Sequence, residues 1–272
     1  MKLKPSYPRL RRDHPLAEGL IGAWLMTEGS GGRLRNAAES GLGDANAVNV
    51  PQWSAGSRGA VFGGDGTGHA AVPHGKAFDL TELTLTVIAK RLVSPSESDM
   101  IAGRPVSTSP TDVPFRMLFI SGSLAFDYIT SGTPVRTSTS SALHVNNEWF
   151  VVSGAIGKVT ATQYRATLYS SGEFLSNSAA AITAPPARIS PFFIGAENNR
   201  RFFNGKIDGV WLHSKWLNTQ TGQIQELHDD PFAMFRPRQR SYFAFFADGA
   251  PPDPPTAPRR RQQPQLIGCG VI

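Results

Sequence analysis

The chain has 272 residues, of which 40% are hydrophobic and 18% are charged, so it holds enough apolar material for a sizeable core and is not a wholly disordered protein. Its 27 glycines and 21 prolines favour turns over helices, and its single cysteine, Cys269, excludes an internal disulfide. The net charge of +6 is concentrated at the two ends: residues 1–20 hold five basic against two acidic residues, and residues 231–272 hold six against two, while the stretch between them is close to neutral.

Short β-strands are predicted along most of the chain. Residues 83–89, Leu-Thr-Leu-Thr-Val-Ile-Ala, alternate with period two, which is typical of a half-buried strand. Turn residues recur about every 8–15 positions, a spacing that favours a β-sandwich over alternating strands and helices. Apolar stretches predict two hairpins, one from residues 117–120 with 124–129 and one from residues 165–169 with 174–175. They also predict three single strands, at residues 149–155, 192–195 and 205–214.

One helix is predicted, at residues 219–228, because a capping-type residue stands near its start and Asp-Asp-Pro at 229–231 ends it. Beyond it the composition changes: residues 231–246 are rich in aromatic side chains, and residues 250–258 form a stiff proline-rich spacer before three arginines. Three parts are therefore expected: a basic N-terminal arm at 1–18, a sandwich at 19–230, and an aromatic, Pro-rich and Arg-rich tail at 231–272.

Six segments resemble, in the same order, the strands of concanavalin A-like lectin/glucanase domains of the laminin-G type. The resemblance covers residues 19–230 and implies an all-β fold, a two-sheet antiparallel jelly-roll sandwich with one short helix and extended basic terminal arms. The six segments are Gly19 to Gly32, Val61 to Pro73, Leu83 to Lys90, Asn147 to Gly154, Tyr169 to Glu173, and Ile194-Gly195 followed by Phe203 to Leu212.

The stretch from Leu227 to Arg238 is similar to the ending of this domain in proteins of tailed bacteriophages and prophages. That similarity implies a structural virion protein, assembled in the host cytoplasm, with phage capsid or tail proteins and sister copies as partners. A head decoration (cement) or head-fibre role is favoured, because coiled-coil heptads and fibrous repeats typical of a long tail fibre are missing. The alternative is a carbohydrate-binding adhesin on the tail that recognises surface glycans.

No catalytic residues are predicted, so the chain is not expected to be an enzyme. The hydrolases of the superfamily use the pattern Glu-x-Asp-x-x-Glu, with one acid as nucleophile and another as general acid. The nearest match is Glu97-Ser-Asp99, whose third position is Ala102, and it is expected to lie in a Ser- and Pro-rich loop. The sequence also has no Gly-x-Ser-x-Gly elbow and no phosphate-binding loop.

No cofactor is predicted, and the one that the resemblance would allow is a calcium ion held by Asp65 and Asp208, although Gly209 stands where the family often has a further acid. The alternative is that Asp65 forms a turn and Asp208 ends a strand. The six histidines share no short motif, so zinc is not expected.

The glycan-binding residues are left open by the sequence. Exposed aromatic rings would provide platforms for sugars, with Trp53, Trp216 and Tyr128 as candidates. Three other tryptophans occur in strand patterns and are expected in the core: Trp24, Trp149 and Trp211.

The two basic ends have three readings: docking on an acidic protein surface, contact with nucleic acid, or solubility. Nucleic acid is not expected, because the basic excess lies outside the folded body, and no apolar run is long enough for a membrane span. The aromatic residues after 231 either fold back onto one face of the sandwich or form a patch completed by a neighbouring subunit. The residues predicted to anchor the chain to a virion or to sister copies are Arg9, Arg11, Arg12, Phe232, Phe235, Arg236, Arg238, Arg240, Phe243, Phe245, Arg259, Arg260 and Arg261.

Overall fold

The computed structural model describes most of the chain as far as residue 236. By their contacts the residues divide into two units, Met1–Pro237 and Arg238–Ile272, and all described residues belong to the first. No helix among them is long and apolar enough to cross a membrane. The described residues are 4–5, 8–40, 42–48, 52–53, 60–62, 68–92, 98–104, 114–130, 133–138, 146–178, 190–197 and 201–236.

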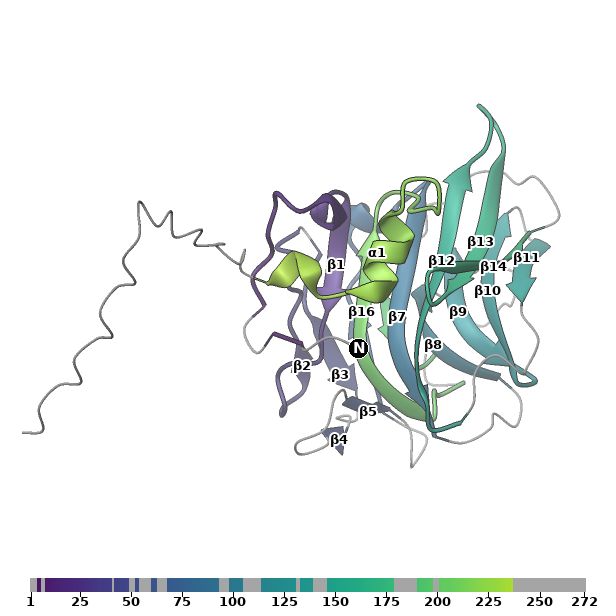
Figure 1. The fold of residues 1–272 in the computed structure, drawn as a ribbon. Helices are drawn as coiled ribbons and strands as arrows, with labels where there is room; N and C mark the ends of the chain where they lie inside the picture. Colours follow the sequence, from purple (N-terminus) through teal and green to yellow (C-terminus); the bar gives the residue numbers. More distant parts are fainter. Residues whose placement is uncertain are drawn as a thin grey trace, which may run out of the picture. The chain divides into compact units, whose positions relative to one another are not determined.

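The described strands form two antiparallel sheets packed face to face, which confirms the predicted all-β sandwich (Figure 1). In sheet A the order is β14-β13-β12-β7-β16-β5-β4, and β1 also pairs with β16. Its strands are β1 (Leu20–Trp24), β4 (Gln52–Trp53), β5 (Ala60–Phe62), β7 (Leu83–Arg91), β12 (Trp149–Lys158), β13 (Tyr164–Ser170), β14 (Glu173–Asn177) and β16 (Gly205–His213).

Sheet B has the order β11-β10-β9-β8-β15-β6-β3-β2. Its strands are β2 (Arg33–Leu34), β3 (Ala45–Val48), β6 (His69–Val72), β8 (Ser98–Arg104), β9 (Phe115–Ile120), β10 (Ser123–Thr130), β11 (Thr133–Ser138) and β15 (Phe192–Ile194).

The main core lies between the two sheets, because alternate side chains of each strand point to the same side. Met117 and Phe119 of β9 and Phe126 of β10 are buried there from sheet B. The stacked rings of Trp24 in β1 and Phe192 in β15, with centroids 5.2 Å apart, join the two layers. The side of sheet B that faces away from this core is called its outer face below.

Both predicted hairpins are present, each closed by Ser-Gly. The turn residues have positive φ in both cases: 47° and 83° at Ser121 and Gly122, and 51° and 80° at Ser171 and Gly172. Two successive positive φ values define a type I′ turn, whose twist matches that of the strands it joins. These local signals explain why both hairpins can be predicted from the sequence.

The outer face of sheet A is covered by the chain itself. The cover consists of η1 (Pro15–Ala17), α1 (Gln223–Asp229) and η4 (Ala233–Phe235), and Figure 1 shows α1 lying over β16 and β7. Phe232 packs edge-on against Trp211 of β16, with ring centroids 5.5 Å apart. The helix ends as predicted but begins later, because Gly222 at its N-cap has a left-handed φ of 68°.

Several strands were not predicted from the sequence patterns, and two of them pair with the β9–β10 hairpin. Residues 98–104 form β8 and pair with β9, although the match Glu97-Ser-Asp99 was expected in a loop, and residues 133–138 form β11 and pair with β10. Asp99 therefore lies on a strand, which corrects the loop prediction. Pairing with a strongly apolar neighbour overrides the weak strand preference of the Ser, Asp and Gly residues in β8.

Candidate functional site

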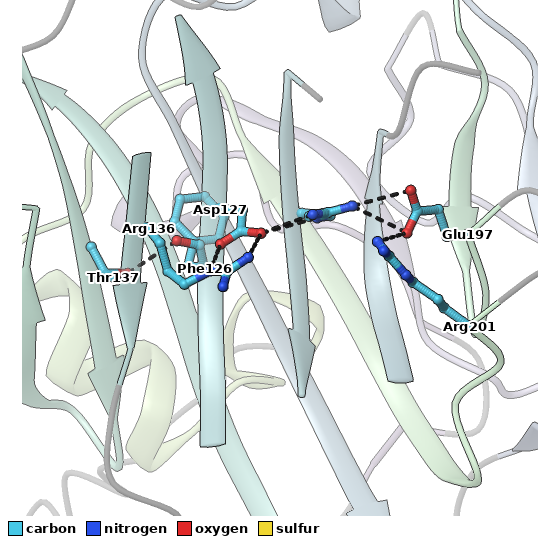
Figure 2. A network of polar contacts seen from close by, with 7 residues as sticks. Phe126, Asp127, Arg136, Thr137, Glu197 and Arg201 are labelled. Atoms are coloured by element: carbon cyan, nitrogen blue, oxygen red, sulfur yellow. Dashed lines mark hydrogen bonds and ion pairs between the residues drawn. The ribbon is translucent and has the colours of Figure 1, made fainter. Parts of the chain in front are cut away.

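Five charged side chains form an unbroken series of ion pairs across the outer face of sheet B (Figure 2). In spatial order, this charged row consists of Arg136, Asp127, Arg116, Glu197 and Arg201. Strand register explains three of the five: Asp127 of β10 lies opposite both Arg136 of β11 and Arg116 of β9, which places all three on one face. The segment after β15 supplies the other two.

The centre of the charged row is buried and fully paired. The Arg116 guanidinium donates from Nε and Nη2 to Oδ2 of Asp127, at 3.2 and 3.0 Å, and from Nη1 to both oxygens of Glu197, at 3.1 Å. All three side chains are almost inaccessible to solvent. Burying charges is costly unless hydrogen bonds satisfy them, and this geometry provides those bonds.

The two ends of the charged row are half-exposed guanidinium groups. Arg136 donates from Nε and Nη2 to the two oxygens of Asp127, at 2.6 and 2.9 Å, and Arg201 donates from Nη1 to Oε2 of Glu197 at 2.7 Å. Their side chains are 43% and 32% exposed. The hydrogen bond to Asp127 raises the pKa of Arg136, so this end stays charged. Within the described part of the chain, Nη1 of Arg136 and both Nε and Nη2 of Arg201 have no acceptor.

Aromatic and apolar side chains lie beside the charged row on the same face. Phe193 of β15 lies opposite Gly103, which in turn lies opposite Arg116. The ring of His69 lies 6.0 Å from those of Phe193 and Phe202. Phe193 and His69 are buried and Phe202 is partly exposed, so Phe202 is the ring of this group that can offer its face to a sugar, which has apolar C–H faces and polar hydroxyls.

The two carboxylates of the charged row are poorly arranged for glycoside hydrolysis. A glycosidase needs one carboxyl group to donate a proton and the space between the two free for the sugar or a water. Here Asp127 and Glu197 each accept from two guanidinium groups, and Arg116 bonds to both and occupies the space between them. The arrangement can bind acceptor groups, but it offers no acid–base pair.

Of the two residues predicted to bind a metal ion, the structure describes Asp208 but not Asp65. Asp208 is fully buried in β16, where Oδ1 of its carboxylate accepts from Nζ of Lys4 at 2.8 Å, and Asp65 lies outside the described residues. In the described part of the chain, no three His, Cys, Asp or Glu side chains are grouped to hold a metal ion.

Asp99 has a partly buried carboxyl whose pKa is raised by desolvation, but Glu97, its predicted companion, lies outside the described residues. A second potentially reactive pair, Ser153 Oγ and His228 Nε2 at 2.7 Å, lies under α1. The backbone N–H of Gly172 donates to Nδ1 of His228 at 2.6 Å, so the proton of the neutral ring is on Nε2 and is donated to Ser153. A catalytic base needs the opposite arrangement, and this pair fastens the helix to sheet A.

Of the aromatic candidates for sugar platforms, Tyr128 is wrong because its ring is fully buried in the main core. Trp53 is partly buried and donates from Nε1 to the carbonyl of Gly31 at 3.0 Å. Trp216 packs over Gly157, where an added Cβ would lie 1.9 Å from its ring. Among the tryptophans expected in the core, Trp24 and Trp211 are fully buried and Trp149 is partly buried.

The predicted anchoring residues fall into three groups. Arg9 and Arg12 are exposed, whereas Arg11 and Arg236 are partly buried. Phe232 and Phe235 are buried under the cover of sheet A, so these two fold back onto the chain's own sandwich rather than forming an exposed patch. The remaining residues lie outside the described part of the chain: Arg238, Arg240, Phe243, Phe245, Arg259, Arg260 and Arg261.

The charged row was not predicted, although the sequence contains part of its signal. Arg116 and Asp127 each alternate with large apolar residues in a strand, which indicates a charge on the non-core face. Glu197 and Arg201 are four positions apart in an otherwise polar stretch of the sequence. What joins the two parts is the position of β15 in sheet B, and no local pattern specifies it.

The model of the concanavalin A-like lectin/glucanases superfamily (Laminin_G_3) matches residues 63–221, more than half of the chain. No curated protein matches the sequence.

Several solved structures share the fold at low sequence identity. Trypanosoma rangeli sialidase is 17% identical with a TM-score of 0.61, over 80% of this chain and 34% of that chain. A second structure concerns botulinum neurotoxin type C, whose cell entry is described as dependent on two ganglioside molecules. It is 12% identical, with a TM-score of 0.58, over 79% of this chain and 52% of that one. A mutant of HCR/D is 10% identical, with a TM-score of 0.61, over 80% and 52%. The chain thus spans between a third and about half of these proteins, and the likeness is one of fold.

Proposed function

Because the chain belongs to the concanavalin A-like lectin/glucanase superfamily, we propose that it is a non-catalytic carbohydrate-binding module whose ligand lies on the outer face of sheet B. The observation that carries the proposal is the charged row, which ends in two half-exposed guanidinium groups. The opposite sheet is unsuitable, since η1, α1 and η4 cover its outer face.

The proposed ligand class is an acidic glycan. Arg116, Arg136 and Arg201 outnumber the two carboxylates they bind, and the free N–H groups at both ends suit a carboxylate or paired hydroxyls. Similar structures support the class: one is titled as a sialidase in complex with sialic acid, and another names gangliosides.

A glycan array probed with the full chain tests this proposal. Arg136→Ala and Arg201→Ala should each weaken binding to acidic glycans by about tenfold or more, since a charge-assisted hydrogen bond contributes about 1.5–3 kcal/mol. Arg33→Ala is the matched control: Arg33 is a 71% exposed arginine at the β2 end of the same sheet, ion-paired with Asp44. Equal losses in all three variants, or no glycan bound by the folded chain, would refute the proposal.

The C-terminal unit favours a second function. We propose that the chain is a structural protein of a tailed phage particle, most simply a head decoration or head-fibre protein, which displays the sandwich and attaches through its terminal arms. Support comes from the separate unit Arg238–Ile272, with its proline-rich spacer and arginines, and from the phage-like ending at residues 227–238. Attachment to sister copies and to capsid proteins follows from this proposal. Both functions are compatible in one chain.

Immunogold labelling of purified particles, with mass spectrometry of the same preparation, tests the second function. Label over the head would support decoration, and label at the tail tip would instead support a receptor-binding adhesin. Deletion of residues 238–272 should abolish attachment while leaving glycan binding unchanged. Particles without the protein would overturn the virion proposal and leave the carbohydrate-binding proposal standing.

A further inference from the structure

Strand β16 changes its partner along one edge. Its residues Gly205–Ile207 pair with β5, whereas Val210–His213 pair with β1. Asp208 stands between these two stretches and forms a bulge against β7, where Ile207 pairs with Ala89 and Gly209 with the adjacent Ile88. Such a bulge leaves backbone groups outside the regular ladder and places the buried Asp208 carboxylate beside them.

The ammonium group of Lys4 lies at this junction. Its Nζ donates to the carbonyl oxygen of Asp208 at 2.9 Å, to Oδ1 of the same residue at 2.8 Å, and to the carbonyl oxygen of Met26 at 3.1 Å. Met26 follows β1 and has a positive φ of 50°. The Lys4 side chain is only 13% exposed. Three oxygens from two chain segments thus converge on one cation.

Two carbonyls and a carboxylate are ligands of the type that a calcium ion takes. The family resemblance implied calcium at Asp208, yet the oxygens there already bind an ammonium group supplied by the chain. We infer that Lys4 is a built-in counter-ion that replaces a metal ion at the β1–β16 junction. The sandwich is then independent of divalent cations while residue 4 is docked, and loss of the ammonium uncovers a cation site.

The buried carboxylate of Asp208 needs a positive partner, because burying a charge is costly. A carboxylate as inaccessible as that of Asp208 is strongly destabilising without a positive partner. A lysine on the same chain provides that partner at every calcium concentration, whereas a bound ion would dissociate when calcium is scarce. Docking of Lys4 also ties the N-terminal segment to β16, 204 residues later in the sequence.

Thermal unfolding of the full chain and of Lys4→Met tests the inference. Methionine keeps most of the apolar stem and removes the charge. The unchanged protein should melt at the same temperature in EDTA and in millimolar calcium. The melting temperature of Lys4→Met should fall by about 5–10 °C in EDTA, and calcium should restore at least half of the loss. Terbium should bind Lys4→Met and not the unchanged protein, detected by luminescence sensitised by nearby tryptophan.

Lys215→Met is the matched control, because Lys215 makes a more exposed pair with Glu18 near the same strands. It should shift the melting temperature by less than about 2 °C and acquire no response to calcium. If Lys4→Met fails to fold, Lys4→Met/Asp208→Asn removes both charges and should fold without responding to calcium. Stabilisation of the unchanged protein by calcium, or a Lys4→Met variant that ignores calcium, would overturn the inference.

Discussion

Tyr128 carries an unsatisfied polar group in the main core. Its ring is fully buried, its hydroxyl has no hydrogen-bond partner among the described residues, and burial raises the pKa of its phenol. A buried hydroxyl without a partner costs about 1–3 kcal/mol. Tyr128→Phe is therefore expected to raise the free energy of unfolding by about 1 kcal/mol, measured by urea denaturation.

Tyr169→Phe is the control for this prediction. The Tyr169 hydroxyl interacts with Trp216 and Thr167, so its removal should be neutral or destabilising. If Tyr128→Phe destabilises the protein as well, the Tyr128 hydroxyl has a partner such as a buried water.

At this scale the sequence itself distinguishes the two faces of β10. Tyr128 alternates with Leu124 and Phe126 in one strand, and this period alone places all three in the core. The same alternation places Asp127 on the other face. Its pairing with Arg116 follows from the predicted hairpin, because the Ser121-Gly122 turn fixes the register.

At the scale of elements, two buried histidines fasten the cover to sheet A. His213 of β16 donates from Nε2 to the carbonyl of Leu16 in η1 at 2.9 Å, and His228 joins α1 to Ser153 of β12. Burial lowers the pKa of both rings from 6.5 to about 4. Each ring is therefore neutral in the folded protein at a pH where the unfolded chain already binds a proton.

These lowered pKa values predict acid sensitivity. The contribution of these two histidines to the free energy of unfolding should be constant above about pH 7 and should fall between pH 6.5 and 4, by on the order of 3 kcal/mol for each histidine. Below about pH 4 both rings are protonated in the folded and the unfolded chain, so their contribution should stop changing. Urea denaturation across this range measures the effect. His213→Gln/His228→Gln should flatten this part of the profile, and each single variant should remove about half of the slope. An unchanged slope in the double variant would show that other groups cause it.

Local signals account for the elements that were predicted. The hairpins and the helix depend on turn residues and caps within a few positions of each other, so their patterns were sufficient. By contrast, β8 lacks an apolar alternation and is a strand only because β9 and β15 lie on either side of it. The charged row depends on that same neighbour relation, since Arg116 of β9 reaches Glu197 beyond β15. For this reason the fold class was predicted and the candidate site was not.

At the scale of the whole molecule, we propose that the folded body extends beyond residue 230. The tail was expected to begin at residue 231, but Phe232 and Phe235 are buried in the cover, and the backbone N–H of Arg11 donates to the carbonyl of Met234 at 2.8 Å. Contacts place the division between residues 237 and 238.

Two truncations test this boundary. A chain ending at Pro237 should melt within about 2 °C of the full chain, whereas one ending at Asp230 should lose about 5–10 °C, because removal of a buried Phe alone costs about 3–5 kcal/mol. Differential scanning calorimetry compares the two. Equal melting temperatures would mean that residues 231–237 contribute little to the body.

The pairing of the first long strand with the last has a consequence for synthesis. The carbonyl of Leu16 and its partner His213 are 197 residues apart, and β1 pairs with β16 along the same edge. At about 5–20 residues per second, a ribosome needs roughly 10–40 s to make the intervening chain. For that time the nascent chain holds Trp24 and its neighbours without their native strand partner, so this apolar segment is exposed to chaperones for most of translation.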